Sequence, residues 1–198
     1  MPREQLRGDI KRKRLTYLIS RCIEKERSFV FLDESGVKTN MARQYGWADR
    51  SNRCIDYTPH GHWETSTIIS AIRSNQVIEE ATFIIDGPMT GECFVGYIKH
   101  HLAPNLKPGE IVVMDNLATH KCAGVREAIE DVGCDLWYLP PYSPDLNPIE
   151  KLWSKVKSCM RNSAARSHEQ LLAALNAELK TVNAEECRNY FKSCGYAK

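Results

Sequence analysis

The sequence predicts an α/β fold in which helices flank a mixed five-stranded sheet, built from a three-strand antiparallel meander and two parallel strands. The order of the elements is the first reason: three strand-like stretches precede a helix, a strand, a helix and a strand, and helical patterns fill the remainder. The second is that residues 28–32 and 111–114 are almost entirely apolar, which is typical of strands buried on both faces. These two strands can lie side by side in the sheet.

The first half of the chain predicts one helix and then the meander. Residues 4–26 form an amphipathic helix, with apolar side chains at near-helical spacing. These are Leu6, Ile10, Leu15, Leu18, Ile19 and Cys22. Residues 28–32 form a buried strand that ends at Asp33, and Ser35-Gly36 then begins a turn-rich segment. Two further strands are predicted at residues 65–72 and 80–85.

The second half alternates helices with strands and ends in helices. Strands are predicted at residues 111–114, directly before Asp115, and at residues 135–139. Ser167 is a suitable N-cap for the fourth of the helices. The predicted helices cover residues 91–102, 123–132, 149–160 and 168–182, with a last short helix from about Asn183.

Length and composition favour one globular domain with short appendages. The 198 residues are enough for one substantial core, and no stretch approaches the roughly 18 apolar residues of a membrane span. The N-terminus also lacks a secretory signal pattern, so we expect a cytoplasmic protein without membrane partners. We divide the chain into a basic helix and linker (1–27), a central α/β domain (28–165) and C-terminal helices packed on the same domain (166–198).

Cysteine and charge patterns narrow the class of protein further. The eight cysteines form no CxxC pair, so reduced thiols are expected instead of a zinc site or a disulfide framework. Residues 1–27 hold nine Lys/Arg against four Asp/Glu, and residues 151–166 hold five basic residues and no acid. Each basic surface is either a solvated helix face or a site of contact with phosphates, and charge alone leaves both possibilities open.

Three acids lie where predicted elements begin or end. Asp33 and Asp115 follow the two apolar strands, and Glu150 opens a helix. Because ligands gather beyond the carboxyl ends of central strands, these side chains can meet at one point. Three adjacent carboxylates repel one another unless a cation lies between them, and Mg²⁺ prefers such oxygen ligands. A pair of ions held in this way can promote phosphoryl displacement.

The approach to Glu150 is unusually rich in proline. Pro140, Pro141, Pro144 and Pro148 lie within nine residues of LPPYSPDLNPIE. Each proline restrains its own φ and the residue before it, so the segment should hold Glu150 firmly in place. A negative charge is also favoured in the first turn of a helix, where Pro148 breaks no hydrogen bond.

Several other polar residues have structural and functional interpretations. Glu34 should point to the opposite side of the strand from Asp33. Asp86, before Gly-Pro, favours a turn, and Asp145 and Asn147 favour bonds to their own backbone, although both could orient a metal-bound water.

The histidines and tryptophans are equally open. His120 is the most plausible catalytic helper, yet a helix-capping or ligand-orienting role fits as well. His60 and His62 favour a structural or DNA-facing role over metal binding. The four tryptophans, Trp47, Trp63, Trp137 and Trp153, favour core positions.

The motifs FLDESG, PHGHW, VVMDNLATHK and LPPYSPDLNPIEKLWSKVK together resemble the catalytic domain of mariner-like transposases, and most closely its bacterial insertion-sequence (six-thirty) branch. Thirty-four residues separate Asp115 from Glu150, the spacing typical of that branch. The resemblance implies a ribonuclease H-like fold in which Asp33, Asp115 and Glu150 are the catalytic, metal-binding residues. It also implies two Mg²⁺ ions, with Mn²⁺ as a substitute.

The resemblance further implies an activity and its partners. These are hydrolysis at the terminal inverted repeats of a transposon, transfer of the freed 3′-hydroxyl into double-stranded target DNA at TA, homodimeric assembly, and a nucleoid location when bound. We expect the triad to be supported by four neighbours, Glu34, Asn116, His120 and Asn147. We expect DNA contacts from His60, His62, Lys121, Lys151, Lys155, Lys157 and Arg161.

One departure from the family bears on function. Its members usually carry an N-terminal helix-turn-helix region that reads the terminal repeats, and here only about thirty residues precede Asp33. A separately encoded helix-turn-helix region joined by frameshifting, a decayed copy and a trimmed chain all stay open. Two other functions also stay open: a non-catalytic regulator that binds DNA or the full transposase, and a structure-specific nuclease on the same scaffold.

Overall fold

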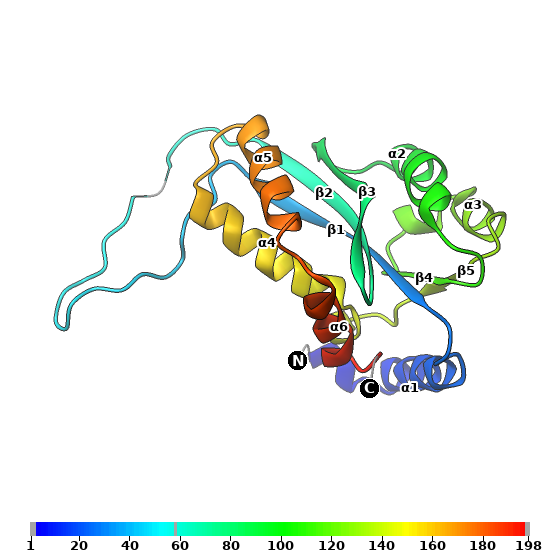
Figure 1. The fold of residues 1–198 in the computed structure, drawn as a ribbon. Helices are drawn as coiled ribbons and strands as arrows, with labels where there is room; N and C mark the ends of the chain where they lie inside the picture. Colours follow the sequence, from blue (N-terminus) through cyan, green and yellow to red (C-terminus); the bar gives the residue numbers. More distant parts are fainter. Residues whose placement is uncertain (1–2, 58, 197–198) are drawn as a thin grey trace.

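A computed structural model describes residues 3–57 and 59–196 and contains one five-stranded sheet of order β3-β2-β1-β4-β5 (Figure 1). The first three strands form an antiparallel meander, and β4 and β5 run parallel to β1. The sheet therefore confirms the predicted mixed arrangement, which is that of a ribonuclease H-like fold. The strands are β1 (Phe29–Lys38), β2 (Thr65–Arg73), β3 (Gln76–Asp86), β4 (Ile111–Met114) and β5 (Asp135–Tyr138).

The helices lie close to their predicted positions. Ser167 and Asn183 cap α5 and α6 by accepting the amides of Gln170 and Glu186. A π-turn at Ile98–Leu102 extends α2 to the predicted end of that helix. The six α-helices are α1 (Gly8–Ile23), α2 (Gly91–Tyr97), α3 (Val125–Glu130), α4 (Ile149–Ser163), α5 (His168–Leu179) and α6 (Ala184–Ser193).

The sheet carries a hydrophobic core on each face, because successive side chains of a strand point to opposite sides. On one face Phe31 packs in a cluster with Trp153 and residues of α5 and α6. On the other, Leu32 packs in a cluster with Phe94 and residues of α2 and α3. Figure 1 shows α4, α5 and α6 on one side and α2 and α3 on the other. Burial on both faces explains why residues 28–32 and 111–114 are apolar throughout.

Strand β1 does not end at Asp33. It continues to Lys38 because β2 supplies an antiparallel partner, with Ser35 opposite Ile68 and Gly36 opposite Thr67. The parallel pairing with β4 covers only residues 29–31. Asp33 therefore lies inside a strand, just past the point where the neighbour on its other edge has stopped. That position leaves its side chain accessible from the β4 side.

Helix α1 is packed differently from the prediction. Ile10 and Tyr17 are buried, whereas Leu6, Leu15 and Ile19 are 68%, 59% and 53% exposed. The reason is that polar groups make much of its contact with the body: Arg14 and Arg21 bind partners near the C-terminal half of the chain. Apolar spacing alone could not reveal this, since the arginines occupy the packed face.

The loop between β1 and β2, residues 39–64, extends away from the body (Figure 1). Trp47 is 100% exposed and Trp63 is 50% exposed, so the predicted core position is wrong for both. They lie in a loop that reaches beyond the core, and Trp63 is covered in part by Lys38, whose Nζ lies 5.9 Å from the centre of its ring. Trp153 is buried and Trp137 is partly buried against the same core, as expected.

Three further features concern the cysteines, Asp86 and the helices. All eight cysteines are free thiols. Asp86 ends β3 and lies 2.7 Å from His168 Nδ1, in keeping with a structural role. Within residues 3–57 and 59–196, the structure contains no helix that is both long and apolar enough to span a membrane.

Candidate active site

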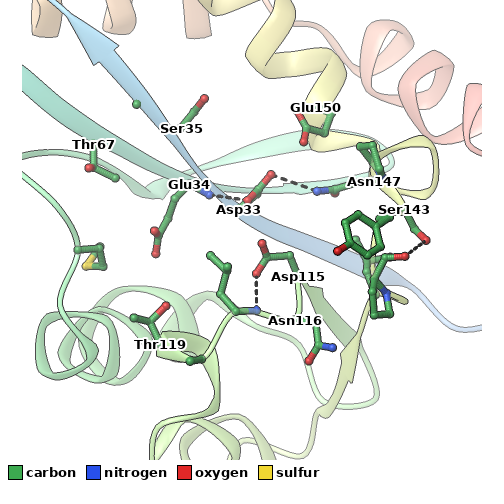
Figure 2. Close-up of a pocket in the computed structure, with 18 of the residues that line it drawn as sticks. Asp33, Glu34, Ser35, Thr67, Asp115, Asn116, Thr119, Ser143, Asn147 and Glu150 are labelled. Carbon is green, nitrogen blue, oxygen red and sulfur yellow. Dashed lines mark hydrogen bonds between the residues drawn. The ribbon is translucent and has the colours of Figure 1, made fainter. Parts of the chain in front are cut away.

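Three carboxylates from distant parts of the chain line one pocket. Asp33 comes from β1, Asp115 follows β4, and Glu150 lies in the first turn of α4. All three line a pocket of about 1060 Å³. Figure 2 shows their side chains directed into this shared space. The middle of β1, the end of β4 and the start of α4 thus meet where the β4–β1 pairing stops.

Asp33 is the most deeply placed of the three. Its Oδ1 accepts the Glu34 amide at 2.8 Å, and its Oδ2 accepts Asn147 Nδ2 at 3.1 Å (Figure 2). Burial, together with the negative charges of Glu150 and Asp115, raises the pKa of Asp33 from 3.8 to about 7. The carboxylates are therefore close enough to repel one another, a repulsion that a cation would relieve.

His120 lies between the carboxylates of Asp115 and Glu34. Its ring is fully buried and stacks on Phe94 at a centroid distance of 4.4 Å. Nδ1 lies 2.6 Å from Asp115 Oδ1, a close but poorly aligned contact, and Nε2 lies 3.4 Å from Glu34 Oε1. Burial alone would lower the pKa of His120, but hydrogen bonding and charge from Asp115 and Glu34 raise it to about 9. A cationic imidazolium at this place orients the acids.

Glu34 and Asn116 also reach the pocket. Glu34 lies beside Asp33 on the strand, yet it lines the same pocket because that pocket wraps around the end of β4. Asn116 lines its edge next to Asp115. Both predicted neighbours of the triad are therefore near it, although Asn116 makes no direct contact with a triad carboxylate in the described hydrogen bonds.

The proline-rich loop links Glu150 to Asp33. After Pro141 the backbone turns through Tyr142, which has a φ of 57°. Asn147 is buried, and its side chain donates to Asp33 instead of to its own backbone. Its carbonyl accepts the amide of Glu150 at 3.2 Å. One asparagine thus contacts both ends of the site, and Pro148 precedes α4 as expected.

The residues present fit a hard divalent cation. Among the described residues, no three His, Cys, Asp or Glu side chains form a ready-made metal-binding group. The pocket nevertheless offers three carboxylates, and Asn147 Oδ1 is a buried oxygen with no hydrogen-bond partner among the described groups. Mg²⁺ usually takes one or two carboxylates and completes its shell with water and substrate phosphate. An open set of oxygens suits that behaviour.

The charge repulsion around Asp33 makes a stability prediction. A carboxyl whose pKa is raised by folding destabilises the folded state increasingly as pH rises from about 4 to about 7, and constantly above that. Asp33→Asn should therefore raise the free energy of unfolding of the metal-free protein at pH 8 by on the order of 1 kcal/mol or more, since one pKa unit corresponds to about 1.4 kcal/mol. Thermal unfolding in EDTA measures this.

The gain from Asp33→Asn should be smaller at pH 5 than at pH 8. Asp49→Asn, in the exposed loop, is the control and should change little at either pH. An equal gain at both pH values, or a loss at pH 8, would contradict the assignment of a strained carboxylate.

A contact that sequence reasoning missed holds the proline-rich loop from outside. Arg14 of α1 donates to Ser143 Oγ at 2.7 Å and to Asp145 Oδ2 at 2.6 Å. Gln5 donates to the carbonyl of Tyr142 at 2.6 Å. Asp145 therefore binds Arg14 across the fold, and the guanidinium lowers the pKa of that carboxyl. Arg14 and Asp145 are about 130 positions apart in the chain, so no local sequence pattern could predict their contact.

The predicted DNA-contacting residues are spread over the surface. His60 and His62 are exposed, and the loop of residues 39–64 that carries them extends away from the body (Figure 1). Lys121 lies near the pocket, with Nζ 5.6 Å from the centre of the Tyr138 ring. Lys155 is bound to both carboxylate oxygens of Glu186 at 2.8 and 3.0 Å. The others are on α4: Lys151 is exposed, and Lys157 and Arg161 are partly exposed.

Comparison with solved structures supports the fold. The Mos1 transposase paired-end complex with left transposon end is similar with a TM-score of 0.78 at 16% identity, covering 98% of this chain and 61% of that one. The mariner Mos1 paired-end complex with Mg gives 0.74 at 17% identity, with coverages of 98% and 61%. The catalytic domain of Mos1 mariner transposase gives 0.70 at 14% identity, with coverages of 96% and 90%.

The chain therefore spans 61% of the first of these proteins and nearly the whole of the isolated catalytic domain. At these identities the likeness shows the fold alone. A comparison with curated proteins finds no match. The sequence model of the DDE superfamily endonucleases matches residues 28–172, a range that contains all three carboxylates of the pocket. Since this match covers most of the chain, the protein belongs to the DDE superfamily endonucleases.

Proposed function

We propose that this chain is the catalytic part of a transposase that hydrolyses phosphodiester bonds at transposon ends and joins the freed 3′-hydroxyl to target DNA. The observation that carries the proposal is the meeting of Asp33, Asp115 and Glu150 in one pocket. Membership of an endonuclease family supports it, as does the fold shared with a transposase whose structures include transposon ends. We further propose the bacterial insertion-sequence branch and TA targets.

In this proposal Asp33, Asp115 and Glu150 are the catalytic residues and would hold two Mg²⁺ ions, with Mn²⁺ as a substitute. The bound cations would lower the pKa of the attacking water and stabilise the charge on the leaving oxygen. The protein keeps the ligands in place. Asn147 fixes Asp33, His120 fixes Asp115 together with Glu34, and the proline-rich loop fixes Glu150.

The chemistry balances in two displacements at phosphorus. In the first, water oxygen bonds to the scissile phosphorus, the bond from phosphorus to the 3′-oxygen breaks, and the strand ends are a 3′-hydroxyl and a 5′-phosphate. In the second, that 3′-hydroxyl attacks a target phosphorus and displaces a target 3′-oxygen. A proton leaves the nucleophile and a proton joins the leaving oxygen in each step, so no oxidant or energy source is required.

The proposal assigns roles to the rest of the chain. Residues 28–165 are the catalytic domain, residues 1–27 position its proline-rich loop, and residues 166–198 complete its core. Contacts with DNA backbone phosphates come from Lys121, Lys151, Lys157 and Arg161, and from the loop that carries His60 and His62. Lys155 is omitted from this surface because Glu186 already neutralises it. We propose that a homodimer and a separately encoded helix-turn-helix region supply the recognition of terminal repeats.

Incubation with supercoiled plasmid and with pre-nicked transposon-end duplexes tests the function. Nicked or joined products that require Mg²⁺ or Mn²⁺ and disappear with EDTA are expected. No product above the metal-free control would reject it. Flayed, nicked and hairpin substrates in parallel separate transposition from structure-specific cleavage, since the proposal expects no preference for flaps or hairpins.

Arg14 provides a second test through its contact with the loop that carries Glu150. Arg14→Met removes the contacts to Ser143 and Asp145 without opening a cavity. We expect a cleavage rate reduced by about tenfold to a hundredfold, because small displacements of a catalytic group have effects of this order. Stability should change by no more than about 1 kcal/mol, since the pair is partly exposed.

The matched control is Arg7→Met, which removes an exposed arginine of the same N-terminal segment whose ion pair in the described part of the chain is with Asp9. It should cleave like the unmodified protein. Measuring the Mn²⁺ dependence separates positioning from general damage, since Arg14→Met should need more Mn²⁺ for half-maximal rate. Equal rates and metal requirements in both variants would show that Arg14 has no such role.

A further inference from the structure

A second groove adjoins the catalytic pocket on the side of α1. It has a volume of about 580 Å³. Asn116, Leu139, Pro140 and Pro141 line both this groove and the catalytic pocket. The two hollows therefore adjoin at Pro140-Pro141. A strand with one phosphate at the carboxylates could extend directly into the groove.

The walls of the groove combine positive charge with flat apolar surface. Arg12 and Lys13 of α1 line it together with Trp137 of β5, whose ring lies on the α1 side of the sheet, 6.0 Å from the ring of Tyr17. The ring of the next residue, Tyr138, belongs to the core on the opposite face. Among the described residues, those that line the groove include two basic side chains and no acidic one. Such a surface matches a ligand that carries both a phosphate and an aromatic ring.

The two basic side chains of the groove, Arg12 and Lys13, are available for a ligand. Arg14 and Arg27 are neutralised by Asp145 and Asp135. Arg12 and Lys13 have no such acidic partner in the part of the chain that the structure describes, and both are exposed. The helix that carries them is held to the body through Arg14 and Tyr17. Their backbone is therefore fixed next to the catalytic pocket before any ligand arrives.

We propose that this groove binds one unpaired nucleotide of the DNA strand that continues from the scissile phosphate. Its phosphate lies against Arg12 and Lys13, and its base lies against Trp137. The base must be unpaired because only an unstacked base has a free face for an aromatic wall, and such contacts are tolerant of sequence. The volume lies in the range of sites for small ligands. The placement of the scissile phosphate rests on the proposed function; the binding of single-stranded DNA does not.

Fluorescence anisotropy with a fluorescein-labelled 12-nucleotide oligo(dT), measured between 50 and 200 mM salt, tests the groove. The double variant Arg12→Ala/Lys13→Ala should lose about tenfold or more in affinity at 50 mM salt. Its plot of log K against log salt should be shallower by about 0.7, the contribution of one phosphate contact to a single strand. The control Lys11→Ala/Lys25→Ala removes the same charge from neighbouring positions that do not line the groove. It should lose less than about twofold.

Crosslinking identifies the residues that contact the nucleobase and so tests the uncharged part of the groove. Oligo(dT) with one 5-bromodeoxyuridine, irradiated on the full chain, should crosslink to the peptide that contains Trp137 and Tyr138. Thr16→Trp, which fills the groove without altering charge, should abolish this crosslink. Crosslinks found only in other peptides, or equal affinity and salt slope in the two double variants, would overturn the groove.

Plasmid cleavage by the same preparations separates the two proposals. An unmodified protein that binds through the groove but never cleaves DNA would reject the proposed function and leave the groove standing. An Arg12→Ala/Lys13→Ala variant that both cleaves and binds like the control would reject the groove and leave the function standing.

Discussion

Asp115→Asn is expected to reduce DNA cleavage by at least about 10³-fold while leaving the fold intact, because the loss of charge stabilisation at a reacting phosphate has an effect of this order. The amide has the size of the carboxyl but cannot supply its negative charge to a cation. It also leaves the cationic ring of His120 with Glu34 as its remaining acidic contact. The initial rate of plasmid nicking in Mg²⁺ measures the change, and thermal unfolding verifies that the variant is folded.

The control for Asp115→Asn is Asp131→Asn, an exposed acid at the end of α3. It should nick plasmid at the rate of the unmodified protein. Activity of Asp115→Asn within about tenfold of that rate would exclude this carboxylate from the reaction and would favour a non-catalytic regulator.

Arg73→Met is expected to destabilise the protein by about 3–5 kcal/mol, the range for breaking a buried ion pair. Arg73 at the end of β2 donates to both oxygens of Glu110, at 2.6 and 2.8 Å, and both side chains are less than 10% exposed. It also donates to the carbonyl of Asn105 at 2.6 Å. Without the guanidinium, Glu110 would keep a buried charge with no counter-ion. Urea denaturation at pH 7 measures the loss.

Two companion variants give the prediction its specificity. Arg27→Met breaks the more exposed pair with Asp135 and should change stability by no more than about 1 kcal/mol. The double variant Arg73→Met/Glu110→Met removes the stranded charge and should regain most of the stability, as replacement of a buried pair by apolar groups usually does. Equal losses in Arg73→Met and Arg27→Met would contradict this account of the pair.

Much of the fold could be predicted because its signals are local. The central strands are buried on both faces, so residues 28–32 and 111–114 had to be apolar, and their composition revealed them. Ser167 and Asn183 cap helices through bonds to amides three residues away, which the sequence displays directly. The antiparallel meander and the adjacency of the two apolar strands were also anticipated, and the structure contains both.

The parts that could not be predicted depend on contacts between distant residues. Strand β1 passes through Ser35-Gly36 because β2 lies beside it, and nothing in that pair of residues shows the neighbour. Arg14 lies on the packed face of α1 because Asp145, far along the chain, binds it. Trp47 is exposed because the loop that carries it reaches past the core. In each case a tertiary partner, or its absence from the described contacts, outweighed local preference.

In the candidate site, too, the residues with local signals could be predicted and the long-range contacts could not. Asp33, Asp115 and Glu150 were indicated by their positions beside regular elements and by the family resemblance, and the structure brings them to one pocket. The hydrogen bond from Asn147 to Asp33 spans 114 positions, so its presence could be anticipated only as a general neighbour of the triad. The contact of Gln5 with Tyr142 had no signal in the sequence.

Mn²⁺ binding followed by electron paramagnetic resonance tests the central claim most directly, that the three carboxylates share divalent cations. The unmodified protein should bind Mn²⁺ more tightly as pH rises through about 7, because Asp33 must lose its proton. Asp33→Asn, Asp115→Asn and Glu150→Gln should each weaken Mn²⁺ binding by more than about tenfold. Loss of a residue that only hydrogen-bonds to a metal ligand can already weaken metal binding by that much. Binding that is unchanged in all three variants would contradict the account.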